Sequence, residues 1–216
     1  MQNNRSIQRC LAILRAFRVN VSPTLAELSR AVELPHPTVL RFLLTLEEEG
    51  YVARDAGGHW RLTTRMLELG FAAMEGLGVA DAVQEQLQAL ADTYSGTSNL
   101  GEAHPEGVII IGRTMTAAER RRLVVMNLRV GSILPPGSAL ADALPLGPGE
   151  HARRAYPETQ QVSLAVPVRG VLGRQLSIGI STTAAVLESE AQELEAVRAL
   201  QDKADSVGRI LGLAAV

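Results

Sequence analysis

The side chains best suited to chemistry in the first third of the chain are donors and cations at helical spacing. Thr38, Arg41 and Thr45 are three and four residues apart, so they share one face of a helix. An arginine on such a face can donate two hydrogen bonds to guanine O6 and N7, or pair with a phosphate. Leu40 can touch a thymine methyl group, and the amides around Thr38 can attract a phosphate. The chemistry expected here is therefore recognition of duplex DNA.

Basic and polar residues farther along extend this candidate surface. Arg54, His59 and Arg61 suit contact with phosphates or with the minor groove. Each arginine is as often plain solvated surface as a DNA contact, and Leu40 is more often a packing residue. The full set of candidate DNA contacts is Thr24, His36, Pro37, Thr38, Leu40, Arg41, Thr45, Arg54, His59, Arg61 and Arg65.

Three helices must position these residues. Ser6 is expected to cap a helix that ends near Phe17, with apolar residues every three or four positions. Thr24 with Glu27 three residues later is typical of a capping box, which predicts a second helix over 25–32. A third helix is expected over 37–49, because a proline at its first turn loses no hydrogen bond.

A hairpin should follow these helices. Gly50 is expected to end the third helix, and residues 51–54 and 59–62 read as two strands around a turn that contains Gly57 and Gly58. Three helices followed by a hairpin are typical of a winged helix-turn-helix. Such trihelical units also occur as protein-interaction modules, which remains an alternative.

The second half of the chain predicts a mixed α/β domain. Helices are expected over 64–77, 80–94 and 187–211. Strands are expected over 108–111, 123–126, 162–168 and 175–181, the last two around a turn. Residues 131–156 are rich in Gly, Pro and Ala and give no clear pattern. The fold class expected for the whole chain is α+β.

Two groups of residues in this half are weak candidates for binding a small molecule. Ser98, Asn99 and Glu102 can line a pocket, and the amides of Gly137 and Ser138 can hold a small carboxylate if a helix starts there. The alternative is that these are ordinary loop residues.

Other classes of chemistry are not indicated. No His, Cys, Asp or Glu residues have metal-ligand spacing, and no Ser, His and Asp set indicates nucleophilic catalysis, so we expect no metal, no cofactor and no enzymatic activity. The run Arg120 to Arg122 reads as a solvated hairpin edge.

The net charge of −2 requires any DNA contact to come from charge concentrated on one face. Cys10 is the single cysteine, and the sequence shows neither a signal peptide nor a long apolar run. We therefore expect a cytoplasmic protein without a membrane span.

The first third resembles the isocitrate-lyase-regulator (IclR) family of transcriptional regulators. The resemblance lies in TLAELSRA at 24–31, in Leu34-Pro35, in Thr38-Val39 and in RFLLTLEEEGYV at 41–52. It extends without gaps over residues 6–74. The family places Lys and Ser where this chain has His36 and Pro37, and Pro37 offers neither a hydroxyl nor an amide to a phosphate.

The resemblance implies a C-terminal, GAF-like effector domain. Residues 130–135 match a strand-to-helix turn beside the family's pocket, and residues 165–181 match its last hairpin. After Pro135 the match weakens, and between Ala143 and Val162 the chain lacks about one helix and one strand. The expected domains are a winged helix-turn-helix over 1–62, a linker helix over 63–79 and a shortened effector and oligomerisation domain over 80–216.

The sequence thus predicts a repressor or activator that reads a palindromic operator as a homodimer or homotetramer. The first helix and the linker helix are expected to form the dimer contact, and a small organic acid is the expected effector. The alternative is a ligand-independent DNA-binding protein whose C-terminal domain serves only in oligomerisation.

Overall fold

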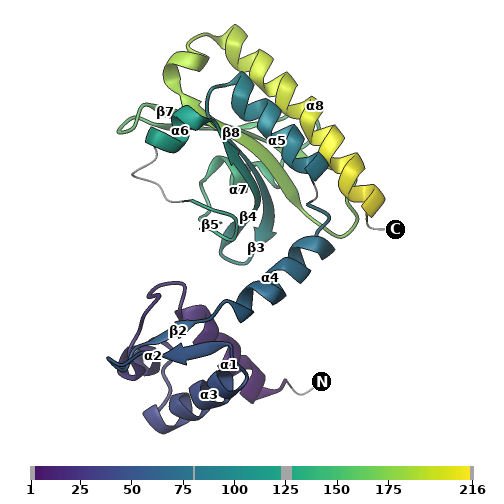
Figure 1. Cartoon of the computed structure of the whole chain (residues 1–216). Coiled ribbons are helices and arrows are strands. Elements are labelled where there is room, and N and C mark those ends of the chain that lie inside the picture. Colours follow the sequence, from purple (N-terminus) through teal and green to yellow (C-terminus); the bar gives the residue numbers. More distant parts are fainter. Residues whose placement is uncertain (1–2, 80, 123–127, 215–216) are drawn as a thin grey trace. The chain divides into compact units, whose positions relative to one another are not determined.

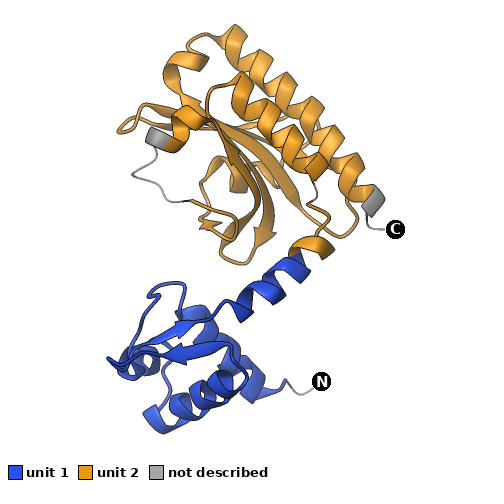
Figure 2. Ribbon diagram, in the orientation of Figure 1, with its two compact units in different colours: residues 1–73 blue, residues 74–216 orange. Residues whose placement is uncertain are grey.

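The computed structural model describes residues 3–79, 81–122 and 128–214. The chain divides into two compact units, residues 1–73 and residues 74–216, which Figure 2 shows in separate colours. Each unit has its own hydrophobic core. The helix α4 (Arg65–Gly76) crosses the boundary between them, and none of its residues is buried.

Unit 1 is a winged helix-turn-helix, as the sequence predicts. Its helices are α1 (Arg5–Ala16), α2 (Leu25–Ala31) and α3 (His36–Glu48), and its hairpin pairs β1 (Val52–Arg54) with β2 (Trp60–Leu62). The large side chains Ile13, Leu28, Leu43 and Trp60 are fully buried between these elements. The wing also touches the start of α2, because the Trp60 amide donates to the Pro23 carbonyl at 2.8 Å.

Two helix starts differ from the expectation. Asn4, not Ser6, caps α1, since its side chain accepts from the amides of Ser6 and Ile7. Helix α3 begins one residue early, at His36, with Pro35 in the N-cap position. Pro37 still lies in the first turn, where its missing amide costs no hydrogen bond.

Unit 2 is built on a six-stranded antiparallel sheet in the order β5-β4-β3-β8-β7-β6. The strands are β3 (Thr97–His104), β4 (Gly107–Met115), β5 (Ile133–Leu134), β6 (Ala152–Tyr156), β7 (Gln161–Val168) and β8 (Leu176–Thr183). The helices are α5 (Asp81–Thr93), α6 (Ala117–Arg122), α7 (Ala139–Ala143) and α8 (Glu190–Ala214), with a 3-10 turn η1 (Ala184–Leu187) before α8.

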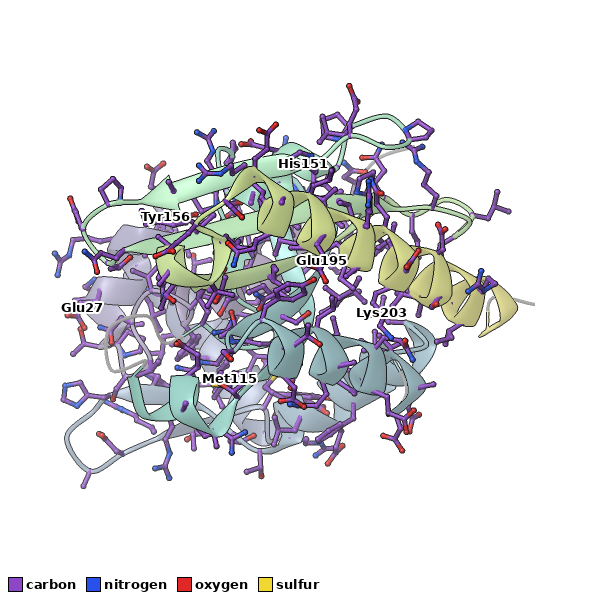
Figure 3. The ribbon with its side chains drawn as sticks, turned by 90° about the horizontal axis from the view of Figure 1, so that it is seen from above. Glu27, Met115, His151, Tyr156, Glu195 and Lys203 are labelled. Atoms are coloured by element: carbon purple, nitrogen blue, oxygen red, sulfur yellow. The ribbon has the colours of Figure 1, made fainter. Side chains whose placement is uncertain are left out.

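Helices cover the two faces of this sheet differently. The long helices α5 and α8 lie side by side on one face (Figures 1 and 3), where Leu87, Leu100, Ile178 and Leu200 form the main core. The two helices are also joined by Lys203 Nζ, which donates to Gln86 Oε1 at 2.9 Å. The short helix α7 packs on the other face over a smaller cluster of mostly alanine side chains.

Several elements of unit 2 differ from the sequence expectation. The central strand β3 was not predicted, because its polar start at Thr97, Ser98 and Asn99 hides the strand pattern. The segment 131–156 contains β5, α7 and β6. The run Arg120 to Arg122 lies in α6 rather than at a hairpin edge, and the expected strand over 123–126 lies outside the described residues.

Candidate functional site

Helix α3 presents a polar face to solvent and an apolar face to the core. Its buried residues are Val39, Leu43 and Leu46, at helical spacing. The opposite side carries the predicted DNA contacts: His36, Pro37, Arg41 and Thr45 are exposed, and Thr38 and Leu40 are partly buried. Among the described side chains none pairs with the guanidinium of Arg41, so its five donors are available to a ligand.

The helix that braces α3 is fixed by the predicted capping box. The Thr24 amide donates to Glu27 Oε2 at 2.7 Å, and the Glu27 amide donates to Thr24 Oγ1 at 3.3 Å. The backbone hydrogen bond from Thr24 lowers the pKa of Glu27, and the Thr24 hydroxyl donating to the same carboxylate lowers it further. The Thr24 hydroxyl is therefore already engaged within the chain.

The wing holds three of the predicted contacts in different ways. Arg54 lies over the Trp60 ring, 5.7 Å from its centroid. His59 Nδ1 is 3.5 Å from Asp55 Oδ1, and the backbone amide of His59 lowers the pKa of Asp55 by donating to it. Arg61 is exposed on β2. Just after the wing, Arg65 lies over the Tyr51 ring at 5.4 Å, so two of these cations are oriented by aromatic rings.

A hollow opens in unit 2 on the face of the sheet that carries α7. Asn99 and Ser138, both predicted from sequence, line it. Arg113 of β4, Ser163 of β7 and Ser181 of β8 line it as well, and the sequence analysis missed all three. The other described lining residues are Thr97, Leu128, Leu134, Ala139, Leu140, Tyr156, Gln161, Leu164, Gly179 and Ile180.

The remaining predicted ligand residues do not line the hollow. Ser98 is fully buried in the strand between two lining residues, and its hydroxyl has no hydrogen-bond partner among the described residues. Glu102 is held by Arg174 at 2.9 Å. The Gly137 amide donates to Asp142 Oδ1 at 3.1 Å, and the Ser138 amide donates to the Pro135 carbonyl at 3.3 Å. Both amides that the sequence offered to a carboxylate thus have partners within the chain.

Polar groups in the hollow come together through strand register. Asn99 lies opposite Arg113 on one side and Gly179 on the other, and Ser181 lies opposite Thr97 and Ser163. Arg113 Nη1 donates to Asn99 Oδ1 at 2.5 Å, and the Ser163 and Ser181 hydroxyl oxygens are 2.6 Å apart. The sequence offered one sign of this site, because Arg113 follows the apolar run 108–111 by two residues. A single arginine after a strand is too common to indicate a binding site.

Metal binding and membrane insertion find no support in the described parts of the chain. No group of three or more His, Cys, Asp or Glu side chains there could hold a metal ion. None of the helices that the structure describes is long and apolar enough to cross a bilayer.

Comparison with known proteins identifies the N-terminal module. Residues 6–56 match the family model of the IclR helix-turn-helix domain. The Pca regulon regulatory protein of Pseudomonas putida is 30% identical over 131 residues, which are 60% of this chain and 44% of that protein. The transcriptional regulator KipR of Bacillus subtilis is 35% identical over 91 residues, 40% of this chain and 36% of the relative. The chain thus spans less than half the length of these relatives.

Solved structures share the fold of the whole chain. An IclR family transcriptional regulator from Brucella abortus matches with a TM-score of 0.79 and 20% identity, over 96% of this chain and 93% of the other. An IclR homologue from Microbacterium hydrocarbonoxydans, solved in complex with 4-hydroxybenzoate, matches with a TM-score of 0.73 and 17% identity, over 95% and 98% of the two chains. The relatives that match are regulatory proteins. Residues 6–56 thus form an IclR helix-turn-helix domain, and the whole chain has the fold of a solved IclR family regulator.

Proposed function

We propose that the chain is a sequence-specific transcriptional regulator that inserts α3 into the major groove of duplex DNA. The observation that carries this proposal is the exposed face of α3. On this face Arg41, which has no partner among the described side chains, lies between Thr38 and Thr45. A helix-turn-helix reads base edges with such a face. Arg54, His59 and Arg61 on the wing, and Arg65 beyond it, supply sequence-independent contacts to the phosphates.

The operator is a palindrome read by a homodimer or a dimer of dimers. Exposed apolar residues on α1 and α4 support this part of the proposal, since Ile7, Leu11, Leu67 and Phe71 are between 47% and 66% exposed. Exposed apolar side chains that gather on two helices are typical of a surface that contacts another protein. A twofold dimer presents two recognition helices to two half-sites, which doubles the phosphate contacts. Such a regulator acts in the cytoplasm, where the DNA is.

A small organic acid acts as the effector in the hollow of unit 2. The hollow combines an apolar lining with a few converging polar groups, as small-molecule sites do. A fold neighbour that was solved with 4-hydroxybenzoate supports the same ligand class. An effector changes DNA affinity only if it binds two arrangements of the dimer with different affinities.

The test is selection from a randomised duplex library by the purified full chain, followed by a salt titration on the best sequence. A regulator of this kind enriches a palindrome, and its affinity for that palindrome falls steeply as the salt concentration rises. The matched control is Arg41→Ala, which removes the candidate base contact at an exposed position. Enrichment of no sequence would rule out sequence-specific reading, and enrichment of the same sequences by the variant at equal affinity would rule out a contact from Arg41.

A further inference from the structure

Leu44 is an apolar residue in the middle of the face that α3 turns away from its core. It is 50% exposed, and it is not one of the described residues that form the core of unit 1 or pack against it. Helical spacing places it one turn after Arg41 and two turns after Pro37, on the side opposite the buried Leu46. Leu44 therefore lies beside the candidate base contact.

Hydrogen-bonding capacity on this face is concentrated in Arg41. The Thr45 hydroxyl donates to the Arg41 carbonyl at 3.1 Å, so its hydrogen is already used within the helix. Thr38 is partly buried, and the side chain of Pro37 has neither a donor nor an acceptor. A face with one strong donor between two apolar side chains, Pro37 and Leu44, has to recognise apolar features of the base edges as well as acceptors.

The acidic end of α3 limits which part of the helix can enter a groove. Glu47, Glu48 and Glu49 are exposed, and the phosphates repel their charges. The turns before them are the part that can approach base edges. Leu44 lies about 4.5 Å beyond Arg41 along the helix axis, which is comparable to the spacing of about 3.4 Å between base pairs.

Thymine supplies the matching apolar feature. Its C5-methyl group is the apolar group that distinguishes it in the major groove, and cytosine has no such methyl. The sequence analysis gave this contact to Leu40, but Leu40 is partly buried and packs against the core of unit 1. The more exposed Leu44 is better placed to cover a methyl group.

We infer that Leu44 reads the methyl group of a thymine one or two base pairs from the base that Arg41 contacts. Each half-site then carries a T·A pair at that distance, and a C·G pair in its place is disfavoured. This inference rests on the proposed function, and it adds a residue that determines the choice of sequence.

The test uses duplexes that lack single methyl groups. The palindrome selected by the purified full chain is synthesised with each thymine of one half-site in turn replaced by deoxyuridine, which removes the methyl group and keeps the base pair. Fluorescence anisotropy measures the affinity of each duplex. One replacement should weaken binding about fourfold, the ratio that corresponds to burial of one methyl-sized group.

Variants of the protein assign that loss to a side chain. Leu44→Ala should bind the thymine and deoxyuridine duplexes equally, so that the fourfold ratio falls to about one. Leu44→Met keeps an apolar side chain and should keep most of the ratio. Val19→Ala, at a position that is 94% exposed and outside α3, is the matched control and should keep all of it.

Folding is checked by circular dichroism on the same samples. Leu44→Ala should remain folded, because alanine favours a helix at an exposed position. If it does not fold, Leu44→Gln takes its place, since glutamine has a similar length without an apolar end. The inference is overturned if no deoxyuridine duplex binds more weakly than its parent, or if the variant that lacks the leucine keeps the ratio.

The outcomes also separate this inference from the proposed function. A selected palindrome without a methyl effect that depends on Leu44 overturns the role of Leu44 alone. Enrichment of no sequence overturns the proposed regulator and this inference with it. A Leu44→Ala variant that keeps the ratio but changes the oligomeric state in light scattering would instead place Leu44 against a second copy of the chain.

Discussion

Arg174 clamps Glu102 through two nitrogen–oxygen contacts of 2.9 Å, although 72 residues separate them in the chain. The same guanidinium donates from Nη1 to the carbonyl of Leu77, just after α4, at 2.9 Å. One side chain thus ties the segment that follows α4 to the central strand β3. Both partners of the ion pair are mostly shielded from solvent, at 19% and 22% side-chain exposure.

We therefore predict that Arg174→Met lowers the free energy of unfolding by about 1–3 kcal/mol. The variant leaves the shielded Glu102 carboxylate and the Leu77 carbonyl without their donor. Glu102→Gln should cost less, since the amide still accepts one hydrogen bond. Urea unfolding of both single variants and the double variant measures the coupling. Strictly additive losses would show that the pair contributes no interaction energy of its own.

Arg41→Ala should weaken DNA binding by about 1–3 kcal/mol and relax the choice of base at one position of each half-site. That outcome identifies a base contact. If Arg41 contacts a phosphate instead, the variant should lose about the same affinity for every sequence. The slope of log affinity against log salt concentration should then fall by about one. Fluorescence anisotropy on the selected palindrome and on a scrambled duplex distinguishes the two. Unchanged affinity for both duplexes would remove Arg41 from the interface.

Thr24→Ala should destabilise unit 1 by about 0.5–2 kcal/mol, since it deletes an N-cap side chain. Thr24→Ser keeps the hydroxyl and serves as the control. Thermal unfolding followed by circular dichroism reports the difference. If the serine variant loses as much stability as the alanine variant, the hydroxyl cannot be the cause.

The capping box also gives stability a dependence on pH. The pKa of Glu27 in the folded protein lies below its ordinary value of 4.5, because the Thr24 amide donates to the ionised carboxylate. The contribution of Glu27 is therefore present above that ordinary pKa and is lost as the pH falls through the depressed value. Stability measured from pH 6 downward should fall more in the unaltered chain than in Glu27→Gln. Parallel pH profiles would contradict the assignment.

Glycine at position 208 should be required by packing rather than by backbone conformation. An added Cβ there would lie 2.1 Å from the Arg169 carbonyl oxygen, so α8 approaches the β7–β8 turn too closely for a side chain. Gly208→Ala should therefore destabilise unit 2 by about 1–3 kcal/mol, although alanine is the better helix former. Gly70→Ala in α4 is the matched control, because an added Cβ meets nothing within 4 Å there. A stabilising effect at both positions would show that α8 shifts without cost.

Local patterns were predictable because their causes are local. The pair Thr24 and Glu27 is three residues apart, and apolar spacing on α3 fixes which residues face the core. These short-range rules were enough for the winged helix-turn-helix and for the placement of Arg41 on an exposed face. They failed at β3, because its first residues are polar in sequence and yet buried in the folded unit.

The sequence by itself determined the order of helices in unit 1, the exposed face of α3 and the presence of an α/β domain after it. Tertiary structure alone decided which distant residues meet. Arg113 reaches Asn99 through the β3–β4 register, Ser163 meets Ser181 through the β7–β8 register, and Arg174 finds Glu102 across the sheet. The physical reason is that strand register joins residues far apart in sequence, whereas capping and helical periodicity act within one or two turns.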